Sequence, residues 1–429
     1  MTQQRAPSSA RAWSVVIAAL AINLILGVLY AWGVMGKELV VRWHWTRAEA
    51  SMPFTISAAA FAITMIFAGR CQDKIGPRYV AMAGGLILGL GLVASAWAST
   101  PLVMVLTFGL VGGIGIGLGY SATTPPSIKW FPPARKGFIT GIVVSGVGLA
   151  AAYIAPLTQS LLKQTSIPGT FLALGLGTIV LVSLLSLLLA NPPPGYTPLA
   201  SAGAAPSGAA FPKPAAAARP DIDWREMLRT PQFYQLWLTF ILAASAGLMI
   251  ISQVPLIAKD QAHIDKLGFV PVALLAVFNT LGRFLSGAIS DRFGRSRTML
   301  AAFVLQALNM FAFSHYSSPA LLLFGAAFTG LCYGTVFTLF PATTADFYGV
   351  RNLGVNYGLV FTGFGVAAVL GPIVGAAIRD RFGSYVWAFG ISGVMLLIGA
   401  LLAFTLKTPI ARPLSPVRAP APAPTGGGR

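Results

Sequence analysis

The chain has 429 residues, of which 56% are hydrophobic and only 9% charged, and its mean hydropathy is +0.76. Because soluble domains carry about 25% charged residues, this composition indicates an integral membrane protein. The net charge of +18 does not indicate nucleic-acid binding, since the basic residues lie between apolar segments instead of along one face. Two cysteines and three scattered histidines give no metal or disulfide pattern, so we expect no metal ion and no other cofactor.

Twelve membrane spans are expected in chain order, because a helix needs about 20 mostly apolar residues to cross a bilayer. The first apolar run is long enough to span and lacks a convincing cleavage site, which argues against a cleavable signal peptide. The expected spans are residues 13–35, 48–69, 79–98, 101–124, 137–162, 169–190, 232–258, 268–290, 297–315, 319–345, 353–378 and 384–406.

The segments outside these spans complete the expected organisation. Residues 192–220 are rich in Pro and Ala and predict a flexible linker. Residues 221–231 predict a short interfacial helix with Asp221 or Asp223 as its N-cap. The expected units are an N-terminal six-helix half (1–191), a linker with its short helix (192–231), a C-terminal six-helix half (232–407) and a disordered tail (408–429).

A loop motif occurs twice, at residues 69–76 and 287–294. Both copies read Gly, three residues, Asp, a cation, one residue, Gly, and they begin 218 positions apart, about half the chain. This offset indicates one transmembrane unit written twice, hence an all-α membrane protein of twelve transmembrane helices in two pseudo-symmetric six-helix halves. The first glycine of each copy allows close helix approach, and the last suits a turn. The aspartate is placed to cap a helix or to pair with cations across the interface.

The distribution of Lys and Arg predicts the orientation. The termini and the loops on their side of the membrane carry 20 of the 29 basic residues, and the opposite loops carry eight. Because positive charge favours the cytoplasmic side, we expect both termini, the linker, the tail and both motif copies in the cytoplasm. The compact length and short termini favour a multi-pass protein of the bacterial inner membrane.

The doubled motif resembles the signature loop of the major facilitator superfamily. The twelve spans, the central linker and the duplicated half agree with that resemblance, which covers the whole chain. It implies a carrier in which the loops latch one state of an alternating-access cycle, and it says nothing about the cargo. The gating residues it implies are Gly69, Asp73, Gly76, Gly287, Asp291, Arg292 and Gly294.

One charge, Arg283, lies deep within an expected span, whereas all eleven acidic residues lie in loops or at span ends. An arginine at a helix centre costs about 2.5–3.5 kcal/mol. Snorkelling is the structural alternative, because Asp291 follows eight residues later, about 12 Å along a helix. However, side chains lean toward the N-terminus of their helix, which directs Arg283 toward the midplane. A buried guanidinium without an acidic partner favours an anionic ligand, and its fork suits a carboxylate.

Other polar and aromatic residues are expected around Arg283. Asn279 lies one turn earlier on the same helix face, where it orients the guanidinium or donates to a substrate, with structural packing as the alternative. Aromatic residues recur on the spans that would line a central cavity. Together they predict an apolar pocket with one cation and a few hydroxyl donors, suited to a small organic anion; they are Tyr30, Tyr120, Tyr333, Phe337, Phe361 and Phe364.

Several short strings resemble the oxalate/formate antiporter and monocarboxylate transporter branch of this superfamily. They are Gly-Val-Leu-Tyr-Ala-Trp at 27–32, Trp-Phe-Pro at 130–132, Met-Leu-Arg-Thr-Pro-Gln-Phe at 227–233 and Asn-Tyr-Gly at 356–358. The resemblance implies that Arg283, which matches the arginine of the eighth span, binds the substrate carboxylate. It also implies that the aromatic residues at 30, 120, 333, 337 and 361 belong to the cavity.

Two departures from that branch narrow the expectation. Oxalate exchangers carry a second cation, a lysine, where this chain has Phe364, so a dianion would leave one carboxylate buried and unpaired. Proton-coupled monocarboxylate symporters of animals carry an aspartate where this chain has Asn279. A monoanion such as lactate or pyruvate therefore fits best, and the usual proton acceptor is missing.

The expected function is transport of a small monocarboxylate, L-lactate or pyruvate, by alternating access with proton symport. The alternative is a carboxylate anion exchanger of the oxalate/formate type, and a transporter-like sensor or a multidrug exporter fits less well. We expect no enzyme, because the sequence contains no nucleophile–base set, metal cluster or phosphate loop. The expected partners of the monomer are a small carboxylate, a proton and the lipid bilayer, and not nucleic acid.

Overall fold

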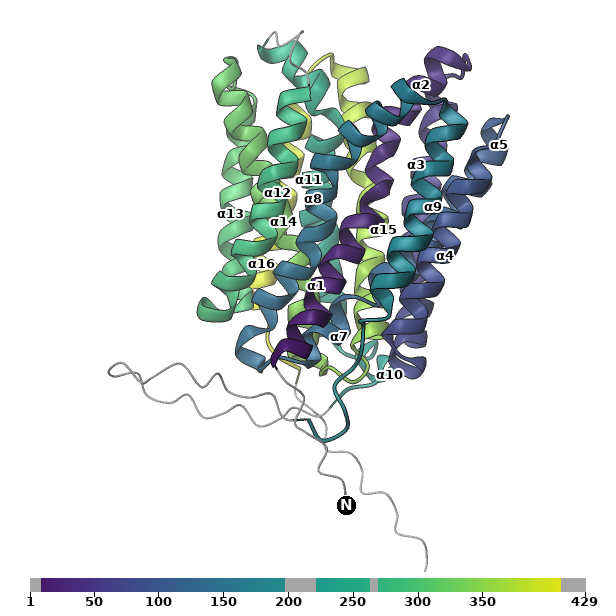
Figure 1. Ribbon diagram of the computed structural model, residues 1–429. Helices are drawn as coiled ribbons and strands as arrows, with labels where there is room; N and C mark the ends of the chain where they lie inside the picture. The colour runs from purple at the N-terminus through teal and green to yellow at the C-terminus, as the bar shows by residue number, and fades with distance from the viewer. Residues whose placement is uncertain (1–8, 197–220, 263–268, 410–429) are drawn as a thin grey trace, which may run out of the picture.

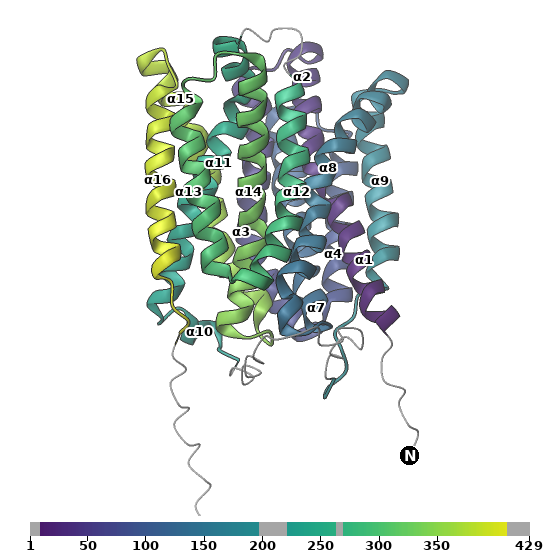
Figure 2. The same cartoon turned by 90° about the vertical axis from the view of Figure 1, so that its left-hand side faces the viewer.

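A computed structural model describes residues 9–196, 221–262 and 269–409, and every regular element in these ranges is helical (Figure 1). Twelve of its helical segments are long and apolar enough to cross a membrane. They run side by side along one axis, and the start of α1 (Ser9–Leu26) and the end of α16 (Val386–Thr405) lie at the same end of the bundle (Figures 1 and 2). The predicted all-α membrane fold is therefore confirmed.

Six spans precede residue 197. They contain α1, η1 (Gly27–Ala31), α2 (Trp32–Arg42), α3 (Arg47–Ile75), α4 (Pro77–Ser95), α5 (Pro101–Met104), η2 (Val105–Gly112), α6 (Gly113–Ser121), α7 (Thr124–Lys129), η3 (Pro133–Arg135), α8 (Lys136–Gln164) and α9 (Ile167–Ser186).

Six further spans follow residue 220, preceded by one short helix. These elements are α10 (Trp224–Met227), α11 (Pro231–Ala262), α12 (Phe269–Phe293), α13 (Arg295–Phe313), α14 (Pro319–Tyr348), α15 (Leu353–Phe382) and α16.

Local sequence signals explain where several helices begin. Thr46 and Glu49 form a capping box at the start of α3, in which the Thr46 side chain accepts from the Glu49 backbone N–H and the Glu49 carboxylate accepts from the Thr46 backbone N–H. Ser166 caps α9 and Ser318 caps α14 by accepting a hydrogen bond from the third residue of the helix. These polar caps satisfy N–H groups that the first turn of a helix leaves without partners.

Two of the expected spans are not uniform α-helices. The first changes to 3₁₀ geometry at η1, and the fourth contains the π-helical stretch η2. At the start of η1, a Cβ on Gly27 would overlap the Cβ of Ala150 on α8, so the close approach of the two helices requires glycine there. The sequence predicted both spans, which run longer in the structure (Ser9–Arg42 and Pro101–Lys129), but not these changes of helical geometry.

The short helix before α11 differs from its expected extent. α10 spans four residues, and Asp223 is its N-cap, accepting from the backbone N–H of Arg225 at 3.4 Å. Asp221 accepts instead from the backbone N–H of Arg351 at 3.0 Å. Most of the predicted flexible linker, at 197–220, and most of the predicted tail, at 410–429, lie outside the described residues.

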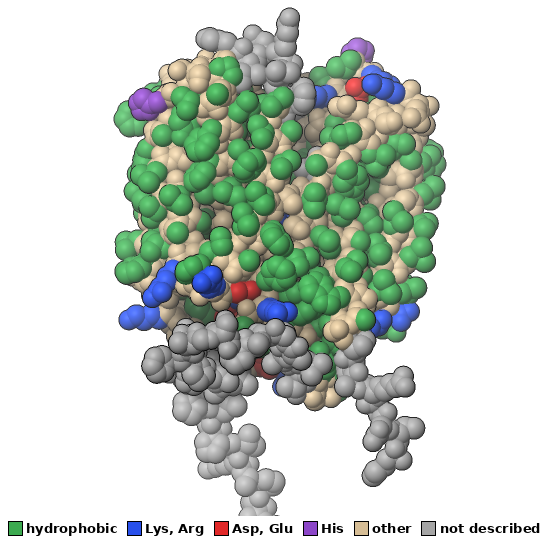
Figure 3. All heavy atoms as spheres, turned by 60° about the vertical axis from the view of Figure 1, so that its left-hand side comes forward, with side chains coloured by type: hydrophobic (Ala, Val, Ile, Leu, Met, Phe, Trp, Pro, Cys, Tyr) green, Lys and Arg blue, Asp and Glu red, His purple; other side chains and the backbone are tan. Residues whose placement is uncertain are grey.

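Helices from before and after the linker pack directly on each other. α8 runs along α12, and α3 runs along α15. Figure 3 shows the sides of the bundle covered with hydrophobic side chains, while most Lys and Arg visible on that face gather near the end that carries α10. We call this end, which also carries both loop motifs, the motif end. The bundle thus presents an apolar belt to a membrane and places α8 against α12 in its interior.

Candidate functional site

The Arg283 guanidinium lies in the interior of the bundle, and the residue is only 1% exposed. Its Nε donates to Oδ1 of Asn279 at 2.9 Å, one turn earlier on α12. Its Nη1 donates to the backbone carbonyl of Val144 on α8 at 2.6 Å. No carboxylate forms an ion pair with it within the described ranges. The cation is therefore buried with neutral partners from two helices.

One face of this guanidinium rests on an aromatic ring. Its Cζ lies 4.4 Å from the ring centroid of Phe337 on α14, a cation–π contact that partly compensates for the lost hydration of the charge. Nη2 has no hydrogen-bond partner among the described residues. An anion would therefore meet the Nη edge of Arg283, because Nε is already bound to Asn279.

Small residues on the neighbouring helices make room for this stretch of α12. A Cβ on Gly334 of α14 would overlap the carbonyl of Asn279, and a Cβ on Gly141 of α8 would overlap the carbonyl of Arg283. The Thr338 hydroxyl donates to that same Arg283 carbonyl at 2.8 Å. The backbone that carries the cation is thus held on two sides, which limits how far the side chain shifts when a ligand binds.

The predicted aromatic residues gather beside Arg283 in one cluster. The ring of Phe361 lies 5.8 Å from Tyr120 and 5.1 Å from Phe364. Phe337 joins the cluster through Phe364 at 5.5 Å and through Tyr333 at 5.3 Å. The structure thus brings these five rings together, although they come from α6, α14 and α15.

Tyr30, the remaining predicted aromatic residue, lies at the edge of this group. It is partly exposed, and it is close enough to Tyr120 and Tyr333 to interact electrostatically with both hydroxyl groups. Tyr30 and Phe364 are the partly exposed members of the predicted set, whereas Arg283 and the other predicted rings are buried. The site is therefore nearly closed to solvent in this conformation.

Three residues of this region were missed by sequence reasoning. Phe61 on α3 lies 5.4 Å from Tyr120 and 5.0 Å from Phe361, ring centroid to ring centroid. Tyr357 packs against Phe361 at 5.7 Å, and the Val144 carbonyl accepts from Arg283. Only Tyr357 carried a signal, through its place in the Asn-Tyr-Gly string at 356–358.

The first copy of the loop motif binds the start of α15. The Asp73 carboxylate accepts hydrogen bonds from the backbone N–H groups of Gly354 at 3.3 Å and Val355 at 3.1 Å. The Lys129 ammonium lies 3.9 Å from the same carboxylate. A Cβ on Gly69 would overlap the Gly354 carbonyl, so glycine allows this close approach.

The second copy makes the same contact with the start of α8. The Asp291 carboxylate accepts from the backbone N–H groups of Gly137 at 2.9 Å and Phe138 at 2.7 Å. Arg295 pairs with Asp291 at 2.7 Å and with Asp346 at 2.9 Å. Gly287 packs against Gly137 as Gly69 packs against Gly354. Each aspartate therefore binds a helix N-terminus from the other side of the linker, where the helix dipole favours a negative charge.

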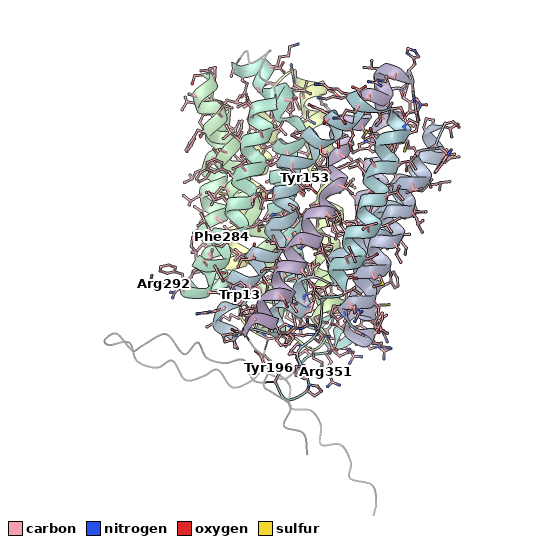
Figure 4. All side chains as sticks on the ribbon, viewed as in Figure 1. Trp13, Tyr153, Tyr196, Phe284, Arg292 and Arg351 are labelled. Carbon is pink, nitrogen blue, oxygen red and sulfur yellow. The ribbon has the colours of Figure 1, made fainter. Side chains whose placement is uncertain are left out.

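The remaining motif residues divide into two groups. Gly76 and Gly294 adopt φ values of +95° and +94°, which favour glycine, so each forms the predicted turn between two helices. Arg292 does not reach the interface in this state: it is exposed, lies beside the Phe293 ring and projects away from the bundle (Figure 4). The cation that pairs with Asp291 is Arg295, which lies outside the predicted gating set, and the gating role of Arg292 stays a prediction.

The end of the linker adds a third contact at the motif end. The Ile222 backbone N–H donates to the Tyr348 carbonyl at 3.0 Å, and the Ile222 carbonyl accepts from Asn356 Nδ2 at 3.0 Å. The Arg70 guanidinium lies 5.9 Å from the Trp224 ring centroid. This segment therefore contacts α3 on one side and the turn between α14 and α15 on the other.

The described residues contain no cluster of three His, Cys, Asp or Glu side chains that could hold a metal ion. The chemistry available at the centre is therefore that of one guanidinium, one amide and several phenol and phenyl rings. Such groups are suited to binding and orienting a small anion.

Comparisons with known proteins agree with this arrangement. The chain is 27% identical over 403 residues to the oxalate:formate antiporter of Oxalobacter formigenes, covering 93% of this chain and 92% of that protein. It is 26% identical to monocarboxylate transporter 13 of Rattus norvegicus, covering 93% and 90%. A solved structure of a proton:xylose symporter superposes with a TM-score of 0.72 at 13% identity, covering 94% of this chain and 97% of that one, and this likeness shows the fold alone.

A family model described as "Major Facilitator Superfamily" matches residues 12–308 and 272–427. These matches cover most of the chain, and the similar proteins are transporters and not enzymes. The chain is a multi-pass membrane protein that belongs to the major facilitator superfamily.

Proposed function

We propose that this member of the superfamily transports a small monocarboxylate, L-lactate or pyruvate, by alternating access and together with a proton. The observation that carries the proposal is the buried Arg283, which has only neutral partners and an unpaired Nη2 within the part of the chain that the structure describes. A guanidinium in this setting gains most from an ionised carboxylate, because charge-assisted hydrogen bonds are about twice as strong as neutral ones. The similarity to the oxalate:formate antiporter and to monocarboxylate transporter 13 supports the same substrate class.

A single carboxylate fits the charge of the site better than two. Phe364 packs its ring on Phe337 and Phe361, so the surroundings of Arg283 are apolar where a second carboxylate would need a cation. Burying an unpaired carboxylate costs several kcal/mol. The same rings favour an acid with a methyl group over formate.

The motif end supports the alternating-access part of the proposal. Asp73 and Asp291 each hold the start of a helix from the opposite half, so this end opens only when both contacts break. We propose these aspartates, with Gly69, Gly287 and Arg295, as the latch that keeps the site closed on this side. The division into two six-helix halves joined by residues 192–231 is part of the same proposal.

The orientation and the membrane are proposed from the sequence. The excess of Lys and Arg at the motif end favours the cytoplasm for that end and for both termini. With that orientation, the described state is closed toward the cytoplasm. A bacterial inner membrane and a monomeric carrier complete the proposal.

The question of which ion accompanies the carboxylate raises a second candidate function. An anion that enters a negative-inside cell works against about 2.3 kcal/mol per 100 mV, so net uptake needs a proton or a counter-anion. The residue that binds Nε of Arg283 is Asn279, an amide that does not titrate. This observation favours exchange of one carboxylate for another as the alternative to proton symport.

Uptake of labelled L-lactate into proteoliposomes separates these candidates. We expect uptake that follows an inward proton gradient into vesicles without internal carboxylate. Uptake that requires an internal carboxylate and does not depend on the proton gradient would indicate exchange instead of symport. If L-lactate is not taken up and no other small monocarboxylate is bound or transported, the proposed substrate class is wrong.

A further inference from the structure

Two tyrosine hydroxyl groups near Arg283 have no role in the function proposed so far. Tyr120 lies on α6 and Tyr357 on α15, and the two residues are 3% and 2% exposed. Both rings pack on Phe361, at 5.8 Å and 5.7 Å. Their hydroxyl groups lie within interaction range of one another, yet neither completes a well-formed hydrogen bond in the described structure.

The hydroxyl groups of Tyr348, which is buried, and of Tyr153, which is partly buried, both have hydrogen-bond partners. The Tyr153 hydroxyl donates to the Leu24 carbonyl at 3.0 Å, and the Tyr348 hydroxyl pairs with that of Thr230 at 3.1 Å. A buried Tyr hydroxyl normally finds such a partner, because leaving it without one carries the full penalty of desolvation. The pair at 120 and 357 therefore departs from the pattern at the place where a ligand is expected.

The pair shares one aromatic cluster with the proposed carboxylate site. The charge of Arg283 acts on the hydroxyl groups of both Tyr120 and Tyr357. The cluster that links them to the guanidinium runs from Phe361 through Phe364 to Phe337, on which the guanidinium rests. Free donors of two kinds, Nη2 of Arg283 and two phenol O–H groups, thus border one aromatic surface.

We propose that Tyr120 and Tyr357 bind the oxygen on carbon 2 of the substrate, so that the transporter selects 2-hydroxy- and 2-oxo-monocarboxylates over unsubstituted ones. The inference rests on the proposed function, because it places the carboxylate on Arg283. A 2-oxo group accepts from one phenol or from both. A 2-hydroxyl group accepts from one phenol and donates to the oxygen of the other. Propionate, which has no oxygen on carbon 2, leaves both phenols without a partner.

Binding of three acids to the purified full-length protein tests this inference. We expect wild-type protein to bind L-lactate and pyruvate about tenfold more tightly than propionate, the factor that one good hydrogen bond supplies. Tyr357→Phe is expected to weaken the binding of L-lactate about tenfold and to leave the binding of propionate unchanged, so that the two affinities become similar. Tyr120→Phe is expected to act in the same direction.

Tyr153→Phe is the matched control, since it also removes one phenol oxygen, here from a partly buried tyrosine whose hydroxyl already has a partner. It should keep the preference for L-lactate and lower the melting temperature of the ligand-free protein. Tyr357→Phe should leave that melting temperature unchanged or raise it, because it removes a hydroxyl without a partner. The melting temperatures thus separate a loss of recognition from a failure to fold.

Equal weakening of L-lactate and propionate in both phenylalanine variants would overturn the inference, because it would indicate a packing role. If wild-type protein binds propionate as tightly as L-lactate, the inference is wrong, but the proposed function is not contradicted. Folded wild-type protein that binds none of the three acids would contradict the proposed function itself, and the inference with it.

Discussion

Arg283 and Arg295 are both poorly exposed arginines of the second half, yet their surroundings are opposite. The Arg295 side chain is 10% exposed and pairs with two carboxylates, Asp291 at 2.7 Å and Asp346 at 2.9 Å. Arg283 is 1% exposed and binds an amide oxygen, a backbone carbonyl and a ring face. Among the described residues, the arginine at the motif end is thus neutralised and the central one has no counter-charge.

This contrast separates two uses of a buried charge. At the motif end, positive and negative groups from different helices satisfy each other, so the charges tie those helices together. At the centre, the burial of an unneutralised cation is unfavourable unless another molecule supplies the negative charge. The same comparison shows why the proposed substrate is an anion and why the proposed latch lies elsewhere.

Replacement of the two arginines with lysine should give the largest difference. The guanidinium of Arg283 binds Asn279 and Val144 and at the same time presents its Nη edge to the carboxylate. Lysine has no such fork, so we expect Arg283→Lys to lower the uptake of L-lactate about 100-fold. Arg295→Lys keeps a cation beside Asp291 and Asp346, so uptake should fall less than about fivefold. Initial rates in proteoliposomes, normalised to the folded protein, measure both. Equal losses of uptake in the two variants would show that the two arginines do not differ in the way proposed.

Replacement of Asp291 should open the motif end more than replacement of Asp73 does. Asp291→Asn loses two charge-assisted backbone hydrogen bonds and the close pair with Arg295, whereas Asp73→Asn loses the corresponding bonds and a looser contact with Lys129. At about 2 kcal/mol, the first change should raise the population open at the motif end about 30-fold, and the second should raise it less. Distances between spin labels at positions 74 and 297, in protein without Cys71 and Cys332, report this opening. The reverse order, or no opening in either variant, would contradict the proposed latch.

A second cation at the centre should change substrate choice. Phe364→Lys places an ammonium group beside the aromatic cluster next to Arg283, and we expect oxalate to compete with L-lactate uptake about tenfold more effectively. Phe364→Met, which removes the ring without adding charge, is the control. If oxalate competes equally in both variants, the charge argument for a monocarboxylate is wrong.

An acid next to Arg283 should introduce a pH dependence. Asn279→Asp puts a carboxylate at the position that binds Nε, so the ionised variant neutralises the cation and binds monocarboxylates weakly. Protonation of the introduced carboxyl restores the positive site, so L-lactate affinity should rise several-fold as the pH falls through its pKa. Affinity measured between pH 5 and 8 tests this change, with wild-type protein as the reference. If the L-lactate affinity of the variant changes with pH no more than that of the wild type, position 279 does not influence the substrate.

The sequence was sufficient for features that depend on local spacing. Asn279 and Arg283 are four residues apart on one helix, and this spacing predicts their contact. Gly76 and Gly294 break the chain into separate helices, as the turn signal predicts. The same break places Arg295, which the sequence did not single out, beside Asp291, because α13 starts anew after Gly294.

Contacts between distant segments had no such local signal. Val144, Phe61 and Tyr357 reach the site only because α8 packs on α12 and α3 on α15. The use of Asp221 also depends on tertiary structure: its carboxylate accepts from the Arg351 backbone, which no spacing along the chain predicts. The sequence therefore identified the cation, but not all of its surroundings.

Binding of L-lactate and of its uncharged amide to purified protein tests the central claim most directly. If the buried Arg283 requires an anion, L-lactate should bind to wild-type protein, lactamide should bind at least about tenfold more weakly, and the uncharged variant Arg283→Gln should remove most of that preference. Lactamide that binds as tightly as L-lactate, or a preference that survives in Arg283→Gln, would contradict the account.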